Sequence, residues 1–247
     1  MQTLLRIVPF IFLLSACGGS SVPDIETDTK QLQISFNESV EDWQAGFSDY
    51  TANDTNYEFS SGQVELPSSV NSPVILIYPP VPTKGFKLSS NNHSDDIFMF
   101  ITKQFAGLEA NRLYDFDFEL SFATNAQKNC IGIGGAPGEA VTIKAGASKT
   151  EPKSINSGNN IYSMNIDKGN QSLGGTDAIA IGDFANEREC GNADTSYMKK
   201  TLRSDRGRFS AYTDAEGKIW VLFGTDSGFE GTTTIYFMHA KVWATRH

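Results

Sequence analysis

The clearest pattern in the chain is a strict alternation of aromatic and acidic residues between Leu113 and Thr124. The stretch reads LYDFDFELSFAT, so Tyr114 and the phenylalanines share one parity while Asp115, Asp117 and Glu119 share the other. A period of two is typical of a β-strand with one face in a core and the other in water. A helix would scatter the same aromatic side chains around its whole circumference. The pattern therefore predicts a long strand near the middle of a sheet.

Other stretches of the chain also follow a strand pattern, and almost none follows a helical one. Apolar and polar residues alternate over 32–36, and the unbroken apolar run 97–101 predicts a strand covered on both faces. Segments 207–213 and 218–223 are expected to pair as a hairpin, and 234–245 as the final strand. These signals predict an all-β fold, a single antiparallel β-sandwich spanning residues 31–247.

The turn before the 113–124 strand adds a resemblance to a known family. Residues 107–112 read GLEANR and lead directly into the aromatic-rich strand, and two more strands close the chain. This order of strand, short turn and aromatic strand resembles the jelly-roll β-sandwiches of many carbohydrate-binding modules. The resemblance implies a jelly-roll topology and a non-catalytic, ligand-binding role, most plausibly with carbohydrate as the ligand.

The first residues of the chain have the composition of an export signal. Residues 1–16 carry Arg6, then an apolar run, then small residues, and are too short to span a bilayer as a helix. Leu14-Ser15-Ala16-Cys17 resembles the lipobox of bacterial lipoproteins, in which the signal is cut before the cysteine. That resemblance implies a signal peptide over 1–16 and a Cys17 acylated on its thiol and amine. An ordinary cleaved signal with a coincidental cysteine is the alternative.

The segment after Cys17 is polar and has no hydrophobic period. Residues 17–30 are therefore expected to form the lipidated cysteine and a flexible tether. Acyl chains on Cys17 predict a membrane partner and a location in the cell envelope. Gly18 rather than Asp follows the cysteine, which in lipoproteins of Gram-negative bacteria favours the outer membrane.

Charge and cysteine content limit the partners and suggest a cross-link. The formal net charge of −9 argues against binding nucleic acid by electrostatic attraction. Besides Cys17 the chain has only Cys130 and Cys190. In an exported protein such a pair more often forms a disulfide than a metal site, so we predict a Cys130–Cys190 bond. Two free buried thiols are the alternative.

The acidic parity of the 113–124 strand raises a catalytic alternative. Asp115, Asp117 and Glu119 are similar to the E-x-D-x-E strand of laminarinase-like retaining β-glucanases, a resemblance that implies a nucleophile, an assisting carboxylate and an acid/base. Asp115 stands where that family has Glu. Its shorter side chain makes the required approach of two carboxyls harder. A solvated acidic sheet face explains the same residues, and we favour this interpretation.

Aromatic residues are the candidates for ligand contact. Sugar-binding sheets present aromatic rings to the apolar faces of pyranoses. The candidates here are Trp43, Tyr212 and Trp220, with Trp243 as a further one. Tyr212 and Trp220 are expected to face outward together on paired strands. The alternative is that these rings lie in the core, as most aromatics of a sandwich do.

Oxygen-rich turns give the only metal candidates. Asp95 and Asp96 lie in one turn, and Asp226 and Glu230 in another, so a structural Ca²⁺ is a candidate cofactor. Asx-turns account for both stretches without a metal. The three histidines have no zinc-ligand spacing. Three functional classes therefore remain open: a carbohydrate-binding lipoprotein, a glycoside hydrolase, and a structural or assembly lipoprotein without a small ligand.

Overall fold

A computed structural model describes residues 28–71 and 83–247. The expected signal peptide, Cys17 and most of the expected tether lie outside these described residues. Within the described part of the chain no helix is long and apolar enough to cross a membrane.

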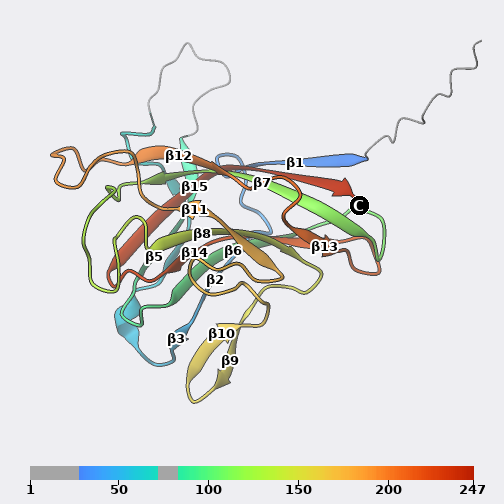
Figure 1. The fold of residues 1–247 in the computed structure, drawn as a ribbon, viewed down its shortest axis with the longest axis horizontal. Coiled ribbons are helices and arrows are strands. Elements are labelled where there is room, and N and C mark those ends of the chain that lie inside the picture. The colour runs from blue at the N-terminus through green and yellow to red at the C-terminus, as the bar shows by residue number, and fades with distance from the viewer. Residues whose placement is uncertain (1–27, 72–82) are drawn as a thin grey trace, which may run out of the picture.

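The strands form two large antiparallel sheets and one small sheet (Figure 1). Sheet A contains β1 (Thr29–Ser35), β4 (Ser60–Glu65), β5 (Lys84–Asn91), β7 (Leu113–Thr124), β12 (Met198–Arg203), β13 (Ser210–Tyr212) and β15 (Thr232–Arg246). Sheet B contains β2 (Gln44–Ser48), β6 (Ile97–Phe105), β8 (Val141–Ser148), β11 (Ala178–Asp183) and β14 (Ile219–Ser227). Sheet C contains β3 (Tyr50–Thr51), β9 (Ser154–Gly158) and β10 (Ile161–Met164), and a 3₁₀ turn η1 (Thr55–Tyr57) precedes β4.

The order of the strands is that of a jelly roll. Sheet A has the order β12–β7–β15–β5, with β13 continuing the β12 edge, and sheet B has the order β11–β8–β14–β6. Counted in chain order, the eight strands of the roll are β5, β6, β7, β8, β11, β12, β14 and β15. Sheet A therefore has the order 6-3-8-1, and sheet B has the order 5-4-7-2. This is the double Greek key of an eight-stranded jelly roll, and β1, β2 and β4 extend its edges. The predicted antiparallel β-sandwich with jelly-roll topology is confirmed.

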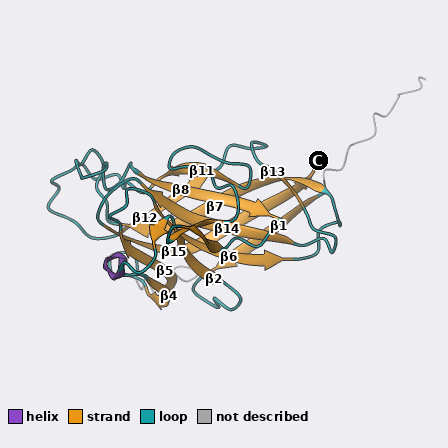
Figure 2. Cartoon of the chain, turned by 90° about the horizontal axis from the view of Figure 1, so that it is seen from below, coloured by secondary structure: helices purple, strands orange, loops and turns teal. Residues whose placement is uncertain are grey.

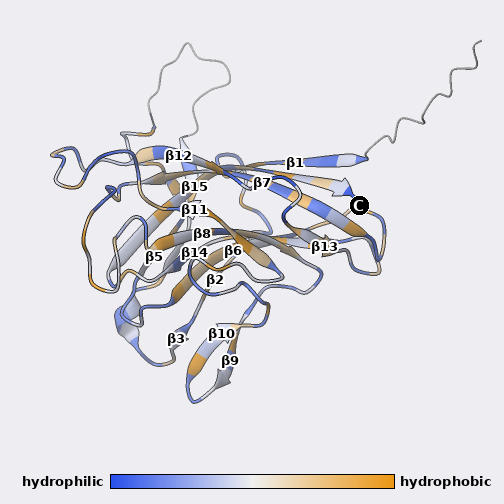
Figure 3. Cartoon of the chain, viewed as in Figure 1, coloured by the Kyte–Doolittle hydropathy of each residue, from blue (hydrophilic) through white to orange (hydrophobic). Residues whose placement is uncertain are grey.

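Strand β7 is an internal strand of sheet A, paired with β15 on one side and with the edge strands β12 and β13 on the other (Figure 2). Its bounds are those that the alternation predicts, and Figure 3 shows apolar and polar positions alternating along it. Phe116 and Phe118 are buried in the main core. The ring of Phe118 meets Phe223 of sheet B edge to face at 6.1 Å, so this contact joins the two layers.

Sheet B is buried on both faces, which explains the apolar run in β6. Ile97, Met99 and Ile101 point into the main core. Phe98 and Phe100 point the other way, into a second small core with Leu222. The chain between β10 and β11, residues 165–177, contributes to the cover of this second face, because Ile166 packs against that core. On the outer face of sheet A, the described residues form one small apolar cluster, of Leu66, Ala123 and Met238.

Candidate functional site

The outer face of sheet A presents polar side chains in rows that run across the strands. β15 lies between β1 and β7, and their register places corresponding residues side by side. Where β15 is paired with β1, the rows are Thr29–Thr245–Asp115, Gln31–Trp243–Asp117, Gln33–Lys241–Glu119 and Ser35–His239–Ser121. Trp243 is the sole Trp, Tyr or Phe in these four rows, and beyond the bulge of β15 the same face continues with Tyr236 beside Ala123.

Trp243 lies half-buried at the side of a surface hollow of about 430 Å³. The loop that follows β12 forms another side of this hollow and supplies Arg206. A volume of this size falls within the roughly 300–1,000 Å³ range of small-molecule sites. The full lining consists of Thr29, Asp117, Phe118, Arg203, Ser204, Arg206, Trp243 and Thr245.

The polar groups around Trp243 are held in place by local contacts. Asp117 accepts a hydrogen bond from the backbone N–H of Gly207 through one oxygen, at 3.0 Å. This bond ties the Arg206 loop to β7. Arg203 forms an ion pair with Glu119, and Arg206 has no ion-pair partner among the residues that the structure describes. The hollow therefore combines one aromatic face, a carboxylate and guanidinium donors.

The three acidic residues of β7 occupy three separate rows, and each has its own partners. Asp115 accepts hydrogen bonds from Ser210, at 2.5 Å, and meets the His247 ring. These bonds hold the pKa of Asp115 below its usual range. These contacts stabilise the ionised form of the Asp115 carboxylate.

Glu119 is also engaged by its neighbours. Burial raises the pKa of Glu119, but ion pairs with Lys241 and Arg203 outweigh this and lower the pKa overall. A retaining hydrolase needs one carboxyl that stays protonated close to a second carboxylate. Two carboxyls with lowered pKa, each neutralised by different side chains, do not meet that need. The contacts of Asp115 and Glu119 therefore give no support to the hydrolase alternative.

Of the aromatics singled out from the sequence, Trp43 packs against the core. Its ring lies 5.1 Å from Phe36 and 6.4 Å from Phe223, so it is not available as an open platform. Trp220 lies half-buried on β14, beside Gln104 and Ser148 of the neighbouring strands.

The expected pairing of Tyr212 with Trp220 is wrong. Tyr212 belongs to β13, which pairs with β7 in sheet A, whereas Trp220 belongs to β14 in sheet B. The turn at Asp214–Gly217 joins two sheets and does not close a hairpin. Alternation identified both segments as strands, but it carries no information about which strand each would pair with. Tyr212 is 57% exposed and lines a different hollow, of about 220 Å³.

The proposed calcium ligands do not form a metal site. Within the described residues no three His, Cys, Asp or Glu side chains lie together as a group that could hold a metal ion. Asp226 is buried and accepts from Lys168 at 2.8 Å, with Lys144 at 3.7 Å. Two ammonium groups therefore stand beside the oxygen that a cation would need. Asp95, Asp96 and Glu230 lie outside the strands, in the loops that precede β6 and follow β14.

Sequence reasoning missed the buried charged cluster around Asp226. Lys168 of the 165–177 segment contacts both Asp226 of β14 and Asp49, which follows β2. Lys144 of β8 is the fourth member of the cluster, and its Nζ lies 3.7 Å from Asp226 Oδ2. Burial raises the pKa of Asp96 to about 6. The charge of Lys168 acts to lower this pKa, and the nearby carboxylates act to raise it. The sole sequence signal was a lysine inside the otherwise small and apolar run of β8.

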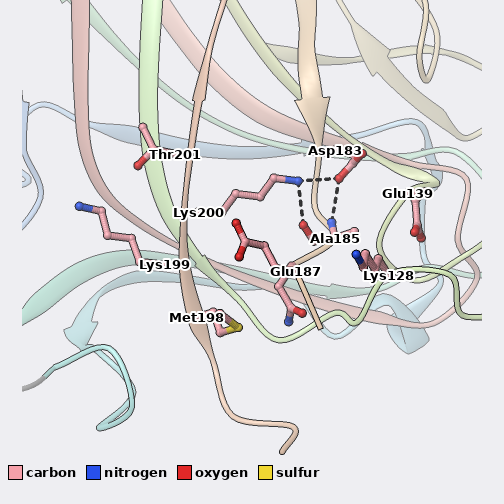
Figure 4. A pocket seen from close by; sticks show the side chains of 10 residues that line it. Lys128, Glu139, Asp183, Ala185, Glu187, Met198, Lys199, Lys200 and Thr201 are labelled. Atoms are coloured by element: carbon pink, nitrogen blue, oxygen red, sulfur yellow. Dashed lines mark hydrogen bonds and ion pairs between the residues drawn. The ribbon is translucent and has the colours of Figure 1, made fainter. Parts of the chain in front are cut away.

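The sequence expectation of a disulfide is confirmed, because Cys130 and Cys190 are bonded. A third hollow, of about 490 Å³, lies between the end of β11 and β12 (Figure 4). Lys200 reaches across it to Asp183 at 2.6 Å and to the backbone oxygen of Ala185. Its lining is dominated by charged side chains that include such a mutual pair, and it contains no aromatic residue.

Comparisons with known proteins give distant structural likenesses. No family model matches the chain, and no curated protein matches it. TmCBM61, solved in complex with β-1,4-galactotriose, superposes with a TM-score of 0.35 at 8% identity, over 82% of this chain and 88% of that one. A cyclase from Fischerella sp. TAU gives 0.38 at 10% identity, over 87% and 98%.

A third structural match covers only a small part of the other protein. The enzymatically active domain of bacteriophage CBA120 tailspike protein 4 gives a TM-score of 0.33 at 10% identity, and the 83% of this chain that superposes spans only 20% of that chain. Because these scores and identities are low, and the proteins differ in activity, the likenesses do not indicate a function for this chain.

Proposed function

We propose that the protein binds carbohydrate, without hydrolysing it, on the outer face of sheet A around Trp243. The observation that carries the proposal is a half-buried tryptophan beside a hollow that also holds Asp117 and Arg206. The C–H face of a pyranose is apolar and packs against an indole ring, while its hydroxyls need donors and acceptors at the rim. The carboxylate and guanidinium groups around Trp243 supply both.

The rigidity of the face also suits this role. Trp243 lies near the C-terminal end of β15, where the strand is paired with β1 on one side and β7 on the other. Asp117 sits in the middle of β7 and is fixed by the bond from Gly207. A ligand that binds to side chains held by paired strands loses little free energy to ordering of the protein.

A glycan array followed by titration tests this proposal. The purified protein is screened against immobilised β-glucans, xylans, mannans and galactans, and the strongest binder is then measured by calorimetry. Trp243→Ala should weaken binding of that glycan at least tenfold, because the stacking surface is lost. Tyr212→Ala, which removes an exposed aromatic outside the hollow, is the matched control and should bind normally. A blank array, or equal loss in both variants, contradicts the proposal.

We propose in addition that Cys17 is acylated and anchors the protein in the cell envelope, in the outer membrane if the source is Gram-negative. Support comes from the sequence Leu14-Ser15-Ala16-Cys17 alone. Cells fed an alkyne analogue of palmitate should label the wild-type protein and move it to the membrane fraction. The Cys17→Ser variant should lose both the label and the membrane association. A labelled Cys17→Ser protein contradicts the anchor.

A further inference from the structure

The cluster of Lys168, Asp226, Asp49 and Lys144 lies between sheet B and the 165–177 segment that covers it. The Lys168 Nζ is 2.8 Å from Asp226 Oδ2 and 3.1 Å from Asp49 Oδ2. The Asp226 side chain is fully buried and that of Lys168 is 7% exposed. The ring of Phe98 lies beneath the Lys168 ammonium, 4.9 Å from its centroid.

Local structure holds Lys168 at this point. The carboxylate of Asp167 accepts hydrogen bonds from Gly169 and Thr176, so the 165–177 segment is folded back on itself. Asp49 has a left-handed backbone (φ 62°) at the junction of β2 and β3. An aspartate tolerates this conformation better than most residues. The amine and both carboxyls are therefore positioned by three independent elements.

Burial makes the charged form of this pair costly. Two buried ions lose much of their hydration, and their mutual attraction compensates for this only in part. Asp226 Oδ1 is also buried without a hydrogen-bond donor among the described residues. A neutral product formed from these two side chains would avoid the free-energy cost of keeping two charges out of water.

We propose that Lys168 and Asp226 form an intramolecular isopeptide bond, a covalent amide that fastens the 165–177 segment to strand β14. The ion pair and the product differ by one water molecule. The amide N–Cγ bond forms, one Cγ–O bond of Asp226 breaks, and that oxygen leaves as water with two protons from the Lys168 ammonium. Neither an oxidant nor a further reactant is consumed.

Asp49 is placed to move the protons. Its carboxylate, 3.1 Å from Nζ, takes a proton from the ammonium and returns it to the departing oxygen of Asp226. Lys144, 3.7 Å from Asp226 Oδ2, offsets the negative charge that develops on the carboxyl as the amine attacks. Burial works to lower the pKa of Lys168 but the two carboxylates raise it overall, so the reactive neutral amine is a minor form. The reaction is accordingly slow, and effective molarities of about 10⁵–10⁸ M for fixed groups make it feasible.

Lys144 is the competing nucleophile, and its contacts disfavour that role. Its Nζ donates to the backbone oxygens of Lys168 and Leu173, and it lies farther from Asp226 than Lys168 does. The expected product is therefore the Lys168–Asp226 amide alone.

Tandem mass spectrometry of the full-length protein tests this inference. The protein is reduced, denatured and digested with trypsin. The bond predicts one branched peptide joining Lys168 to Asp226, lighter by one water than its two parts, with no cleavage after Lys168. Two separate peptides with normal cleavage after Lys168, or a branch through Lys144, overturn the proposal.

Two variants sharpen the result. Lys168→Arg keeps the positive charge but cannot form the amide, so the branched peptide should disappear. Asp49→Asn keeps a polar side chain of the same size and should lower the fraction cross-linked in freshly made protein by at least tenfold. An Asp49→Asn protein that is cross-linked as fast as the wild type contradicts the role given to Asp49. None of these measurements depends on the glycan site.

Discussion

Trp243 of β15 and Asp117 of β7 are register partners, and both side chains stand on the outer face of sheet A. Their neighbours in the adjoining rows are polar, so the indole ring is an isolated apolar surface surrounded by hydrogen-bonding groups. This arrangement differs from the other two tryptophans, because Trp43 packs on the core and Trp220 lies on sheet B. The proposed carbohydrate site depends on this difference.

Removing the ring of Phe118 should weaken the packing between sheets A and B. Phe118→Ala is expected to lower the free energy of unfolding by about 3–5 kcal/mol, because a fully buried aromatic that touches both sheets is replaced by a cavity. Urea denaturation followed by tryptophan fluorescence measures the change. A loss below about 1 kcal/mol would show that the interlayer contact is not formed as described.

The Cys130–Cys190 bond should stabilise the fold because it lowers the conformational entropy of the unfolded chain. It joins residues separated by 60 positions, and closing a loop of that length contributes roughly 4 kcal/mol on the chain-entropy account. The double variant Cys130→Ser, Cys190→Ser should therefore melt at a clearly lower temperature than the wild type. Reductant should lower the melting temperature of the wild type and leave the double variant unchanged. Equal melting temperatures for wild type and variant would contradict this role.

Asp96 should make stability fall as the pH rises. Its folded pKa of about 6 lies above the ordinary value, so the proton is bound more tightly in the folded chain than in the unfolded one. The stabilisation is complete below the unfolded pKa and is lost as the pH rises through about 6. Because the side chain is partly exposed, we expect about 1–2 kcal/mol. Asp96→Asn should not show this loss between pH 4.5 and pH 8 in urea titrations, and parallel profiles for the two proteins would refute the assignment.

Glu119 should contribute to stability and not to ligand chemistry. Glu119→Gln removes two ion pairs, with Lys241 and Arg203, and is expected to cost about 1 kcal/mol at neutral pH. The lowered pKa gives the sign of the pH dependence: the contribution is present above the ordinary pKa and is lost as the pH falls through the folded value. Chemical denaturation at pH 7 and pH 3 measures this. A difference from wild type that grows on acidification would contradict the ion-pair assignment.

The sequence pattern predicted the layers of the fold and the ends of strand β7. The period of two in β7 depends only on which side chains reach the core, so it can be read locally. The continuous apolar run in β6 likewise indicated a strand buried on both faces, which the second core around Phe98 explains.

The sequence pattern did not predict which strands pair with one another or which buried polar side chains meet. Tyr212 and Trp220 lie close in sequence, yet the crossover between sheets separates them, and alternation does not report on crossovers. The Lys168 cluster brings together residues from four distant segments, and each segment by itself resembles an ordinary turn or strand. Trp243 was recognised as an aromatic candidate, but only the register of β1, β7 and β15 shows the polar residues around it.

The most direct test of the carbohydrate site is an NMR titration that follows the indole N–H signals of the three tryptophans. An oligosaccharide chosen from the glycan array is added to ¹⁵N-labelled protein. We predict that the Trp243 signal shifts progressively to saturation while the Trp43 and Trp220 signals stay in place. Saturable shifts at Trp43 or Trp220 with none at Trp243 would contradict the site on the outer face of sheet A.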